Sequence, residues 1–377
     1  MDLLDLRNEI DKIDSQLIPL LMKRMSISEQ VAQYKVENSM PVLNEKREQE
    51  ILENVAKKCG DKGEIIKTVF SATMDASRAL QHKIIGGGRE LRESVTKALT
   101  DEKLTANGGN IACQGVEGAY SGVTANKIFP DSPIKFYTQF EDVFEAVNKG
   151  EAVFGVIPVE NSTAGSVHES YDLIMKYRFY VVGAYDLKIE HCLCAKEGTK
   201  YEDITDIYSH PQALAQCSNF VKNFDFTGVN YSNTAAAAKF VAESSKKNIA
   251  VICSELAAKK YGLKILKRNV QNNNNNRTRF IVISKKLIIS RGADKISLIF
   301  STADKTGSLY RVLGRFSMAG LNLTKLESRP IENANFNYHF YVDVSGSVRD
   351  SSTIDLMCAL SDELPEFEFL GNFYEHQ

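Results

Sequence analysis

Basic and amide side chains recur at helical spacing in the N-terminal part of the sequence. Arg24 and Lys35 lie 11 residues apart, so on a helix they project from one face at roughly 16 Å from each other. Two long cationic side chains at that separation can converge on one small dianion. Ser77 and Gln81, four residues apart, share a helical face in the same way. A solvated basic face on a helical bundle has the same spacing, and spacing alone favours that second interpretation.

A second group of polar residues lies between residues 110 and 285. Its segments are IACQGVEGAYS (111–121), PVENSTAGSV (158–167), HCLC (191–194), SHPQALAQC (209–217), NTAAAA (233–238) and NRTRF (276–280). Each segment alone is a turn, a cap or a helix start. Their common position at predicted strand ends, facing a cleft between two lobes, indicates a binding site.

The HCLC segment could also be argued as a metal site. Strand alternation, however, places His191 on the face opposite Cys192 and Cys194. We therefore predict no metal there. The seven cysteines of the chain are scattered and odd in number, which is unlike a disulfide framework.

Apolar residues at three-four spacing predict helices over residues 3–36, 44–58 and 62–85, the last ended by three glycines. Asn44 is the expected N-cap of the second helix, and Pro19 is expected to kink the first or to weaken it. Three helices of such unequal length cannot bury their apolar stripes alone, which indicates an intertwined dimer. The polar segment that follows, residues 89–109, is expected to be a linker.

The rest of the chain predicts two further domains. Residues 110–285 alternate short apolar runs with helical stretches, an α/β pattern with halves near 110–185 and 186–270. The asparagine run at 272–276 is expected to be a solvated loop. Residues 295–373 follow the order strand, helix, strand, strand, helix, strand, with strands at 296–301, 322–328, 337–345 and 367–373 and helices at 307–319 and 351–361. That order is the ferredoxin-like split βαβ.

Composition limits the classes of protein that the chain can be. Its 377 residues predict two or three domains. With 46 basic and 48 acidic side chains and 43% apolar residues, the chain can form real cores and has no bias toward nucleic acid. It shows neither a signal peptide nor a stretch apolar enough for a membrane span, so we expect a cytoplasmic protein.

Residues 1–88 resemble the helical chorismate mutase family in the runs LRNEIDKID, KRM, VAQYK and PVLNEKRE. The resemblance implies that Arg7 of the partner subunit, Arg24 and Arg47 bind the two carboxylates of chorismate. Lys35 and Gln81 would donate to the ether oxygen. Three further residues would hold the ring hydroxyl, namely Asn44, Glu48 and Ser77.

Such a set suits a pericyclic rearrangement, because that reaction needs no nucleophile and no proton shuttle. Folding the substrate and stabilising negative charge on the breaking C–O bond suffices. Asn44 stands where aspartate is frequent in the family. An amide still hydrogen-bonds a hydroxyl, so we expect altered affinity and retained activity.

The six segments between residues 110 and 285 together resemble prephenate dehydratase. The resemblance implies a two-lobed fold of the periplasmic-binding-protein type, with the strand at 280–284 returning to the first lobe. It makes Thr278 the residue expected to be essential, followed by Asn161, Glu160, Ser209, His210 and Gln216. No cofactor and no metal would be required.

The reaction gains aromaticity as CO2 and hydroxide leave, so the enzyme mainly orients the substrate and helps the hydroxyl to depart. Thr278 would hydrogen-bond the departing oxygen or relay a proton, since its hydroxyl is too weak an acid to protonate by itself. Glu160 or His210 could supply the proton. Arg279 could bind a carboxylate of the substrate, or it could merely be a solvated side chain on its strand.

The C-terminal segment resembles a phenylalanine-binding ACT domain. The motifs are Gly307-Ser308-Leu309, opening its first helix, and Glu327-Ser328-Arg329-Pro330, after its second strand. A helix N-terminus at Gly307 can accept a ligand carboxylate. A glycine-capped helix and an exposed turn are the structural alternative to an L-phenylalanine site.

Taken together, the resemblances predict an enzyme that converts chorismate to prephenate and prephenate to phenylpyruvate in L-phenylalanine biosynthesis, with feedback by phenylalanine. We expect a homodimer or a higher homo-oligomer. The alternatives are a non-catalytic metabolite sensor, an enzyme with only one active half, and a dehydratase that uses the amino analogue arogenate. A mutase domain favours prephenate, because prephenate is its own product.

Overall fold

The computed structural model describes residues 2–331 and 338–376, which divide into two compact units. One unit contains residues 1–97 and 298–369, and the other contains residues 98–297 and 370–377. The first unit joins the N-terminal helices to most of the C-terminal domain, and the second is the α/β part of the chain. Each unit is described separately below.

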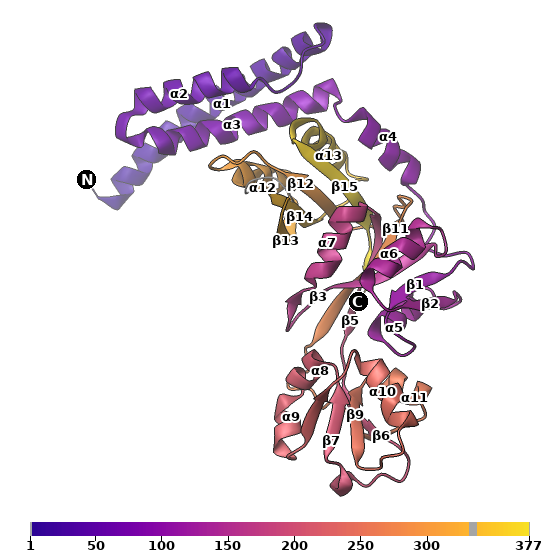
Figure 1. The fold of residues 1–377 in the computed structure, drawn as a ribbon. Coiled ribbons are helices and arrows are strands. Elements are labelled where there is room, and N and C mark those ends of the chain that lie inside the picture. The colour runs from indigo at the N-terminus through magenta and orange to yellow at the C-terminus, as the bar shows by residue number, and fades with distance from the viewer. Residues whose placement is uncertain (1, 332–337, 377) are drawn as a thin grey trace. The chain divides into compact units, whose positions relative to one another are not determined.

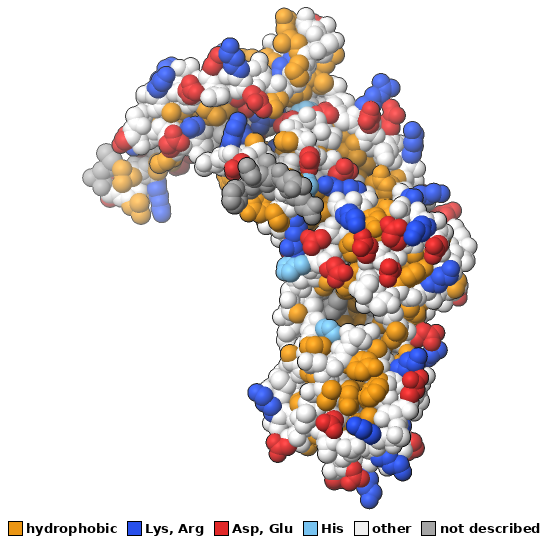
Figure 2. All heavy atoms as spheres, in the orientation of Figure 1, with side chains coloured by type: hydrophobic (Ala, Val, Ile, Leu, Met, Phe, Trp, Pro, Cys, Tyr) orange, Lys and Arg blue, Asp and Glu red, His pale blue; other side chains and the backbone are white. Residues whose placement is uncertain are grey.

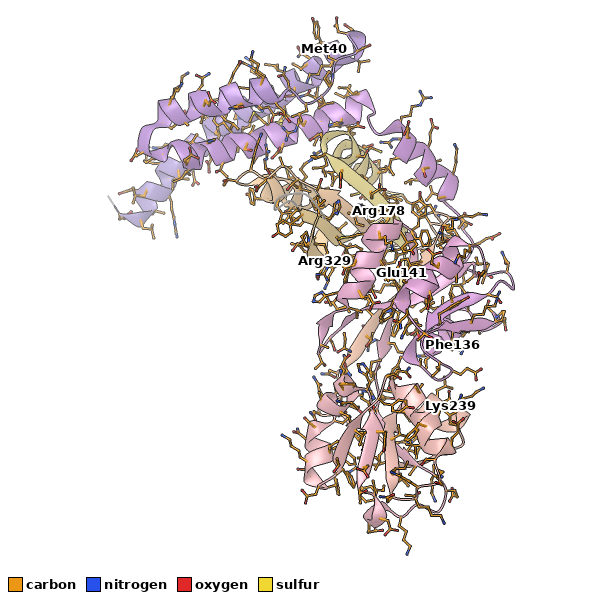
Figure 3. The ribbon with its side chains drawn as sticks, in the orientation of Figure 1. Met40, Phe136, Glu141, Arg178, Lys239 and Arg329 are labelled. Carbon is orange, nitrogen blue, oxygen red and sulfur yellow. The ribbon has the colours of Figure 1, made fainter. Side chains whose placement is uncertain are left out.

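The first unit begins with the predicted helices α1 (Leu3–Glu37), α2 (Glu45–Cys59) and α3 (Gly63–Ile85), with a short 3₁₀ turn at Gly60–Lys62. α1 and α2 both pack on α3 (Figure 1). Pro19 lies inside α1 without ending it. Met40, labelled in Figure 3, marks the turn between α1 and α2. Asn44 is the N-cap of α2 as predicted, because its Oδ1 accepts a hydrogen bond of 3.1 Å from the Arg47 backbone N–H.

α1 leaves most of its apolar face uncovered. It buries Ser28 and Ala32, whereas Leu6, Ile10 and Ile13 are each about half exposed or more. Burying a leucine or isoleucine side chain stabilises a structure by about 1.5–3 kcal/mol, so this face is a large amount of unburied apolar surface. The observation agrees with the sequence argument that these helices cannot bury their stripes alone.

The segment expected to be a linker is in part a helix. α4 (Arg89–Ala98) occupies the first half of residues 89–109, so the expectation of a polar linker is corrected there. Its charged side chains cover an exposed face, while Val95 is buried on the other side. Gly86 takes a left-handed conformation at φ +71° and ends α3, so the chain turns between the two helices without a long loop.

The C-terminal part has the predicted βαββαβ order. The elements are β12 (Lys295–Ser301), α12 (Ser308–Met318), β13 (Asn322–Pro330), β14 (Tyr338–Ser345), α13 (Ser351–Glu363) and β15 (Glu366–Phe373). The strands lie side by side in the order β13-β14-β12-β15, which is the ferredoxin-like arrangement. β13 continues through Pro330, so Glu327-Ser328-Arg329-Pro330 lies within the strand and not after it. Residue 337, the first of the predicted third strand, lies outside the described residues.

In the first unit, α12 and α13 contact α3. Gly88, just after α3, takes φ +64° and lies so close to Cys358 of α13 that a Cβ would not fit between them. Asp362 accepts a hydrogen bond of 2.9 Å from the Gly88 N–H. The helical and the βαββαβ parts of this unit are therefore packed directly against each other.

The second unit contains two lobes. The sheet of the first lobe runs β16-β5-β11-β3-β1-β2, with β4 paired to β3. β11 (Arg277–Ser284) lies antiparallel to both β3 and β5, which confirms that this late strand returns to the first lobe. Its other strands and helices are β1 (Ile111–Gln114), β2 (Ile134–Tyr137), β3 (Phe154–Asn161), β4 (Gly165–Ser166), β5 (Tyr180–Lys188), β16 (Glu375–His376), α5 (Tyr120–Ile128), α6 (Phe140–Asn148) and α7 (His168–Tyr177).

The sheet of the second lobe runs β10-β6-β9-β7-β8. Cys192 and Cys194 pack into one hydrophobic core and Leu193 into the other, which confirms the predicted alternation along β6. The elements of this lobe are β6 (Cys192–Ala195), β7 (Asp206–Ser209), β8 (Thr227–Asn230), β9 (Ile249–Cys253), β10 (Lys264–Lys267), α8 (Pro211–Gln216), α9 (Ser218–Asn223), α10 (Thr234–Glu243), α11 (Glu255–Lys260) and a 3₁₀ turn at Tyr201–Asp203.

The surface carries charges of both signs. Figure 2 shows acidic and basic side chains interleaved over the visible face of the first lobe, in keeping with the formal net charge of −2. Within residues 2–331 and 338–376, none of the helices combines the length and the apolarity that crossing a bilayer requires.

Candidate functional sites

The helical domain gathers Arg24, Lys35, Ser77 and Gln81, the set that the family resemblance implied and that spacing alone did not predict. Arg24 on α1 donates from Nη1 to the Ser77 Oγ on α3 at 2.7 Å and to the Thr73 carbonyl at 3.2 Å. Eleven residues further along α1, Lys35 donates from Nζ to Gln81 Oε1 at 2.9 Å. The two cations are therefore both held against the same face of α3.

Glu48 reaches the same helix from α2. Both of its carboxylate oxygens accept from Nη1 of Arg78, a buried α3 residue that also pairs with Asp75 one turn earlier. The pKa of Lys35 is lowered, mainly because burial disfavours its charged form, with the Glu48 carboxylate opposing and the Arg78 guanidinium adding to the shift. The site is thus an array of charges that face each other in a partly dry environment.

Three predicted residues stay apart from this group. Arg7 lies exposed on α1, 17 residues before Arg24 and so roughly 25 Å away along the helix. Arg47 is also exposed and pairs with Glu50 at 3.4 Å. Asn44 uses its Oδ1 to cap α2. Within one chain, the structure unites four of the eight predicted residues around α3 and adds Glu48 through Arg78.

The two-lobed domain places Asn161 at the centre of a neutral hydrogen-bond network. Its Nδ2 lies within hydrogen-bonding distance of Thr278 Oγ1 at 2.9 Å, Asn276 Oδ1 at 2.8 Å and the Arg277 carbonyl at 3.0 Å. Its Oδ1 accepts from the backbone N–H groups of Thr163 and Ala164. These bonds fix the ends of β3 and β11, which are paired at Asn161 and Thr278.

Gln216 extends the network into the second lobe. Its Oε1 accepts from Asn276 Nδ2 at 3.1 Å and lies 3.0 Å from His191 Nε2, and its Nε2 donates to Asn161 Oδ1 at 3.4 Å. The Tyr120 hydroxyl lies 3.2 Å from the other ring nitrogen of His191. Burial lowers the pKa of His191 and outweighs the opposing hydrogen bond from Gln216, so this imidazole is neutral near pH 7.

Two predicted residues of the second lobe have structural roles. The Ser209 hydroxyl is buried and donates to the Ile252 carbonyl at 2.6 Å. His210 caps α8 by accepting from the Gln212 N–H through Nδ1, and burial lowers its pKa. A histidine with a lowered pKa that is engaged as a cap is poorly suited to donate a proton. Glu160 lies half-buried on β3, next to Asn161.

A cavity of about 250 Å³ adjoins this network between the lobes. Thr163 and Ala164 line it from the first lobe, and Gln212 and Gln216 line it from α8. Asn272, Asn273 and Asn276 complete the wall. The asparagine run is therefore not simply a solvated loop, because Asn276 is buried and hydrogen-bonded to residues of both lobes.

Arg279, left open by the sequence, forms an ion pair with Glu375 of β16. Lys295 lies 3.8 Å from the same carboxylate. Since Arg279 neighbours Thr278 on β11, this contact ties the strand β16 to the strand that carries the site. The structure thus gives Arg279 a partner within the fold.

The C-terminal domain has a cavity of about 330 Å³ at the start of α12. Gly307, Ser308 and Leu309 line it together with Tyr338 and Phe340 of β14. Gly307 takes φ +82° as the N-cap of α12. On β13, Glu327 pairs with Arg329 at 3.2 Å. Arg329 is labelled on this strand in Figure 3.

Sequence reasoning missed three residues that the structure brings into these sites. Asn276 opens the NRTRF segment and directly precedes the strand that carries Thr278, but it was not named as a site residue. His191 lies in HCLC, one of the six segments between residues 110 and 285, but as a single residue it was weighed only as a metal ligand with the cysteines. Arg78 gave no signal, because its partner Glu48 lies on another helix.

Comparisons with known proteins match two parts of the chain to two families. The family model described as chorismate mutase type II matches residues 6–82, and that described as prephenate dehydratase matches residues 111–287. A bifunctional chorismate mutase/prephenate dehydratase of Enterobacter agglomerans is 32% identical over 98% of this chain and 95% of its own length. Arogenate dehydratase 2 of Petunia hybrida is 36% identical over 70% of this chain and 71% of its own length.

One solved structure is that of a prephenate dehydratase from Arthrobacter aurescens in complex with L-Phe. It is 29% identical to this chain with a TM-score of 0.65, and the match covers 70% of this chain and 89% of that chain. The likeness therefore extends well beyond the residues of any single site.

Proposed function

This chain belongs to the family of bifunctional chorismate mutase/prephenate dehydratases, and we propose that its helical domain rearranges chorismate to prephenate while its two-lobed domain converts prephenate to phenylpyruvate. The observation that carries the proposal is the identity of 32% with a bifunctional relative over 98% of this chain. Both reactions belong to the formation of phenylalanine.

In the helical domain, we propose that Arg24 and Lys35 act on one bound chorismate. Arg24 is fixed by Ser77 and would pair with a carboxylate. Lys35, fixed by Gln81, would face the ether oxygen on which negative charge develops as the C–O bond breaks. The bond reorganisation is internal to the substrate, so the protein supplies orientation and a fixed positive charge.

The helical site gains further groups if two chains associate. The exposed apolar face of α1 supports a homodimer in which a second α1 packs on it. Arg7 lies too far along α1 to reach the site of its own chain. In such a dimer it would enter the site of the partner chain and bind the second carboxylate.

In the two-lobed domain, we propose that Thr278 assists the departure of the hydroxyl. Asn161 Nδ2 lies 2.9 Å from Thr278 Oγ1, so the threonine oxygen accepts that bond and its own hydrogen can point to the substrate. The leaving hydroxyl takes up a proton and departs as water while the ring carboxylate leaves as CO2, and the electron pair of the broken C–C bond completes the aromatic ring. Glu160 is the better candidate for the proton source, because His210 is a helix cap with a lowered pKa.

The C-terminal domain is proposed to be an ACT domain that senses L-phenylalanine. Its βαββαβ order and its cavity beside Gly307 support this, as does the L-Phe complex of the dehydratase from Arthrobacter aurescens. Backbone N–H groups at the start of α12 would bind the ligand carboxylate. A cytoplasmic location remains a prediction from the sequence.

The test follows chorismate consumption and phenylpyruvate formation by the purified full chain. Wild type is compared with Lys35→Ala and Thr278→Ala, and each protein is also given prephenate and arogenate directly. We expect Lys35→Ala to lose only the first reaction and Thr278→Ala only the second. Wild-type protein that converts neither chorismate nor prephenate would disprove the proposal, and turnover of arogenate in preference to prephenate would correct the substrate.

A further inference from the structure

The first unit contains a buried cluster of charges that joins the helical domain to the C-terminal domain. Arg78 of α3 stands at its centre, with a side chain only 7% exposed. On one side it pairs with Glu48 and Asp75 of the helical domain. On the other side its Nε lies 3.4 Å from an oxygen of Glu363, the last residue of α13.

Glu363, like Arg78, has several charged or polar partners. Its carboxylate accepts from Arg315 Nη1 of α12 at 2.7 Å and lies 2.5 Å from His82 Nε2 of α3. Burial raises the pKa of this carboxyl, but the His82 hydrogen bond and the Arg315 and Arg78 charges outweigh burial and leave the pKa lowered. Glu363 is therefore an anion that two arginines share.

Helix stability does not explain the position of Glu363. A negative charge at the C-terminal end of a helix opposes the helix dipole and is normally unfavourable. The side chain is only 9% exposed, and a buried carboxylate costs free energy unless it is paired. Its contacts with Arg78, His82 and Arg315 offset this cost. Two of these partners, Arg78 and His82, lie on α3.

The cluster ends at the mutase site. Glu48 has both carboxylate oxygens on Arg78, and it is one of the residues expected to hold the ring hydroxyl of chorismate. Glu48 and Arg78 are also the two charges that act on the pKa of Lys35. A change in the position of Arg78 therefore changes both the direction of Glu48 and the field at Lys35.

We propose that Arg78 and Glu363 are positioning residues of the mutase site: Glu363 of the C-terminal domain holds Arg78, and Arg78 holds Glu48 toward the ring hydroxyl of chorismate. The inference rests on the proposed mutase function and adds that the C-terminal domain completes the mutase site. Neither residue touches the substrate. The helical domain alone would then be a weaker mutase than the full chain.

The test uses the full chain and the substitution Glu363→Gln, which keeps the size of the side chain and removes its charge. Chorismate and prephenate kinetics are measured on the same preparation. If Glu48 binds the ring hydroxyl equally in the ground state and the transition state, its misplacement raises KM and leaves kcat unchanged. We expect a roughly tenfold rise in KM for chorismate, which corresponds to about 1.4 kcal/mol, and unchanged dehydratase kinetics.

Asp355→Asn is the matched control. Asp355 on α13 pairs with Arg92 of α4 at 2.6 Å, so it also joins the helical segment to the C-terminal domain, but within residues 2–331 and 338–376 it forms no ion pair with Arg78 or Glu48. We expect wild-type mutase kinetics from this variant. Equal effects of Glu363→Gln and Asp355→Asn would overturn the inference, because the two domains would then need only to be docked.

A double-mutant cycle separates positioning from general stability. Arg78→Lys keeps the charge but cannot hold Glu48 and Glu363 at once with a planar fork, and we expect a KM at least as high as that of Glu363→Gln. Adding Glu363→Gln to Arg78→Lys should then raise KM by less than twofold. If the two substitutions instead raised KM independently, so that their effects multiplied, the inference would be overturned. The proposed function would still stand, provided that the wild type is an active mutase. A wild type without mutase activity would overturn both the inference and the proposed function.

Discussion

The helical domain and the two-lobed domain solve their binding problems with different chemical groups. Around α3, Arg78 pairs with Glu48 and Asp75, while the cations Arg24 and Lys35 are held by the neutral Ser77 and Gln81, so charged groups dominate the site. Between the lobes, Asn161, Gln216, Asn276 and Thr278 meet a neutral His191. Both sites are partly buried, so the difference does not come from exposure to solvent.

The difference between the charged site and the neutral site matches what the two reactions need. A rearrangement that builds negative charge on an oxygen gains from a fixed cation in a dry site. A dehydration with decarboxylation gains aromaticity and needs its leaving groups oriented, for which neutral donors and acceptors suffice. A charge fixed among those neutral groups would have no partner, and its burial would cost free energy.

The largest expected effect comes from placing a charge in the neutral network. Asn161→Asp removes the donor to Thr278, Asn276 and the Arg277 carbonyl, and turns a carboxylate toward their oxygens. We expect dehydratase kcat/KM to fall by roughly 10³ and the free energy of unfolding to fall by about 2–4 kcal/mol. Mutase kinetics should not change. Steady-state assays measure kcat/KM, and a denaturant titration measures the free energy of unfolding.

The control for that substitution is Asn275→Asp, which adds the same charge to an exposed neighbour in the asparagine run. It should keep wild-type dehydratase kinetics. If Asn161→Asp also kept them, the two-lobed site would tolerate charge, and the contrast between the two domains would be wrong.

A smaller effect is expected from Gln216→Glu. The new carboxylate would lie beside His191 Nε2, which is 3.0 Å from the present amide oxygen. An adjacent anion favours the imidazolium, so the pKa of His191 should rise above its lowered value and dehydratase activity should fall about a hundredfold. An NMR titration of the histidine ring reports the pKa. Asn223→Asp, at the exposed end of α9, is the control, and an unmoved His191 titration would contradict the network.

The pH dependence of the two activities should separate the sites further. Burial lowers the pKa of Lys35, and the mutase needs the charged form. As pH rises through that lowered pKa, mutase kcat/KM should fall up to about tenfold per pH unit. The dehydratase should stay level there, because burial raises the pKa of Tyr120 and His191 is already neutral. If the mutase and dehydratase activities declined over the same alkaline range, pH dependence would not distinguish the two sites.

The smallest effect is expected outside both networks. Glu375→Gln removes the charged partner of Arg279, next to Thr278 on β11. Lys295 would remain nearby. We expect about 1 kcal/mol less free energy of unfolding and a loss of dehydratase activity of roughly threefold. A thermal melt and a dehydratase assay suffice, and a hundredfold loss would instead give Arg279 a direct role in binding substrate.

The sequence predicted the elements more completely than their contacts. Apolar periodicity is local, so α1, α2, α3 and the βαββαβ order could be recognised from it. α4 was missed because its charged composition suggests a linker, and only the burial of Val95 distinguishes it. The return of β11 to the first lobe came from family resemblance, since no local pattern specifies which strand it pairs with.

The sites were predictable to the extent that their residues lie on one element or within one motif. Arg24, Lys35, Ser77 and Gln81 have helical spacing, and the structure unites them. Ser209 and His210 share a motif with Gln216, and in the structure both hydrogen-bond backbone groups of their lobe, which the motif alone did not predict. The link from Arg78 to Glu363 could not be predicted, because it depends on how α13 packs against α3.

The sequence positions of the strands in the first-lobe sheet affect how the chain folds during its synthesis. Its strand β1 begins at residue 111, whereas β11 begins at residue 277 and β16 at residue 375. A chain emerging at about 5–20 residues per second exposes the edges of β3 and β5 for many seconds before β11 arrives to pair with both. The helices α1 and α2 both contact α3 within the first 85 residues, so these three helices can pair long before that. A growing chain would therefore carry paired helices with an uncovered apolar face on α1 ahead of a half-built sheet, and the interval before β11 arrives is when the nascent protein is most open to aggregation.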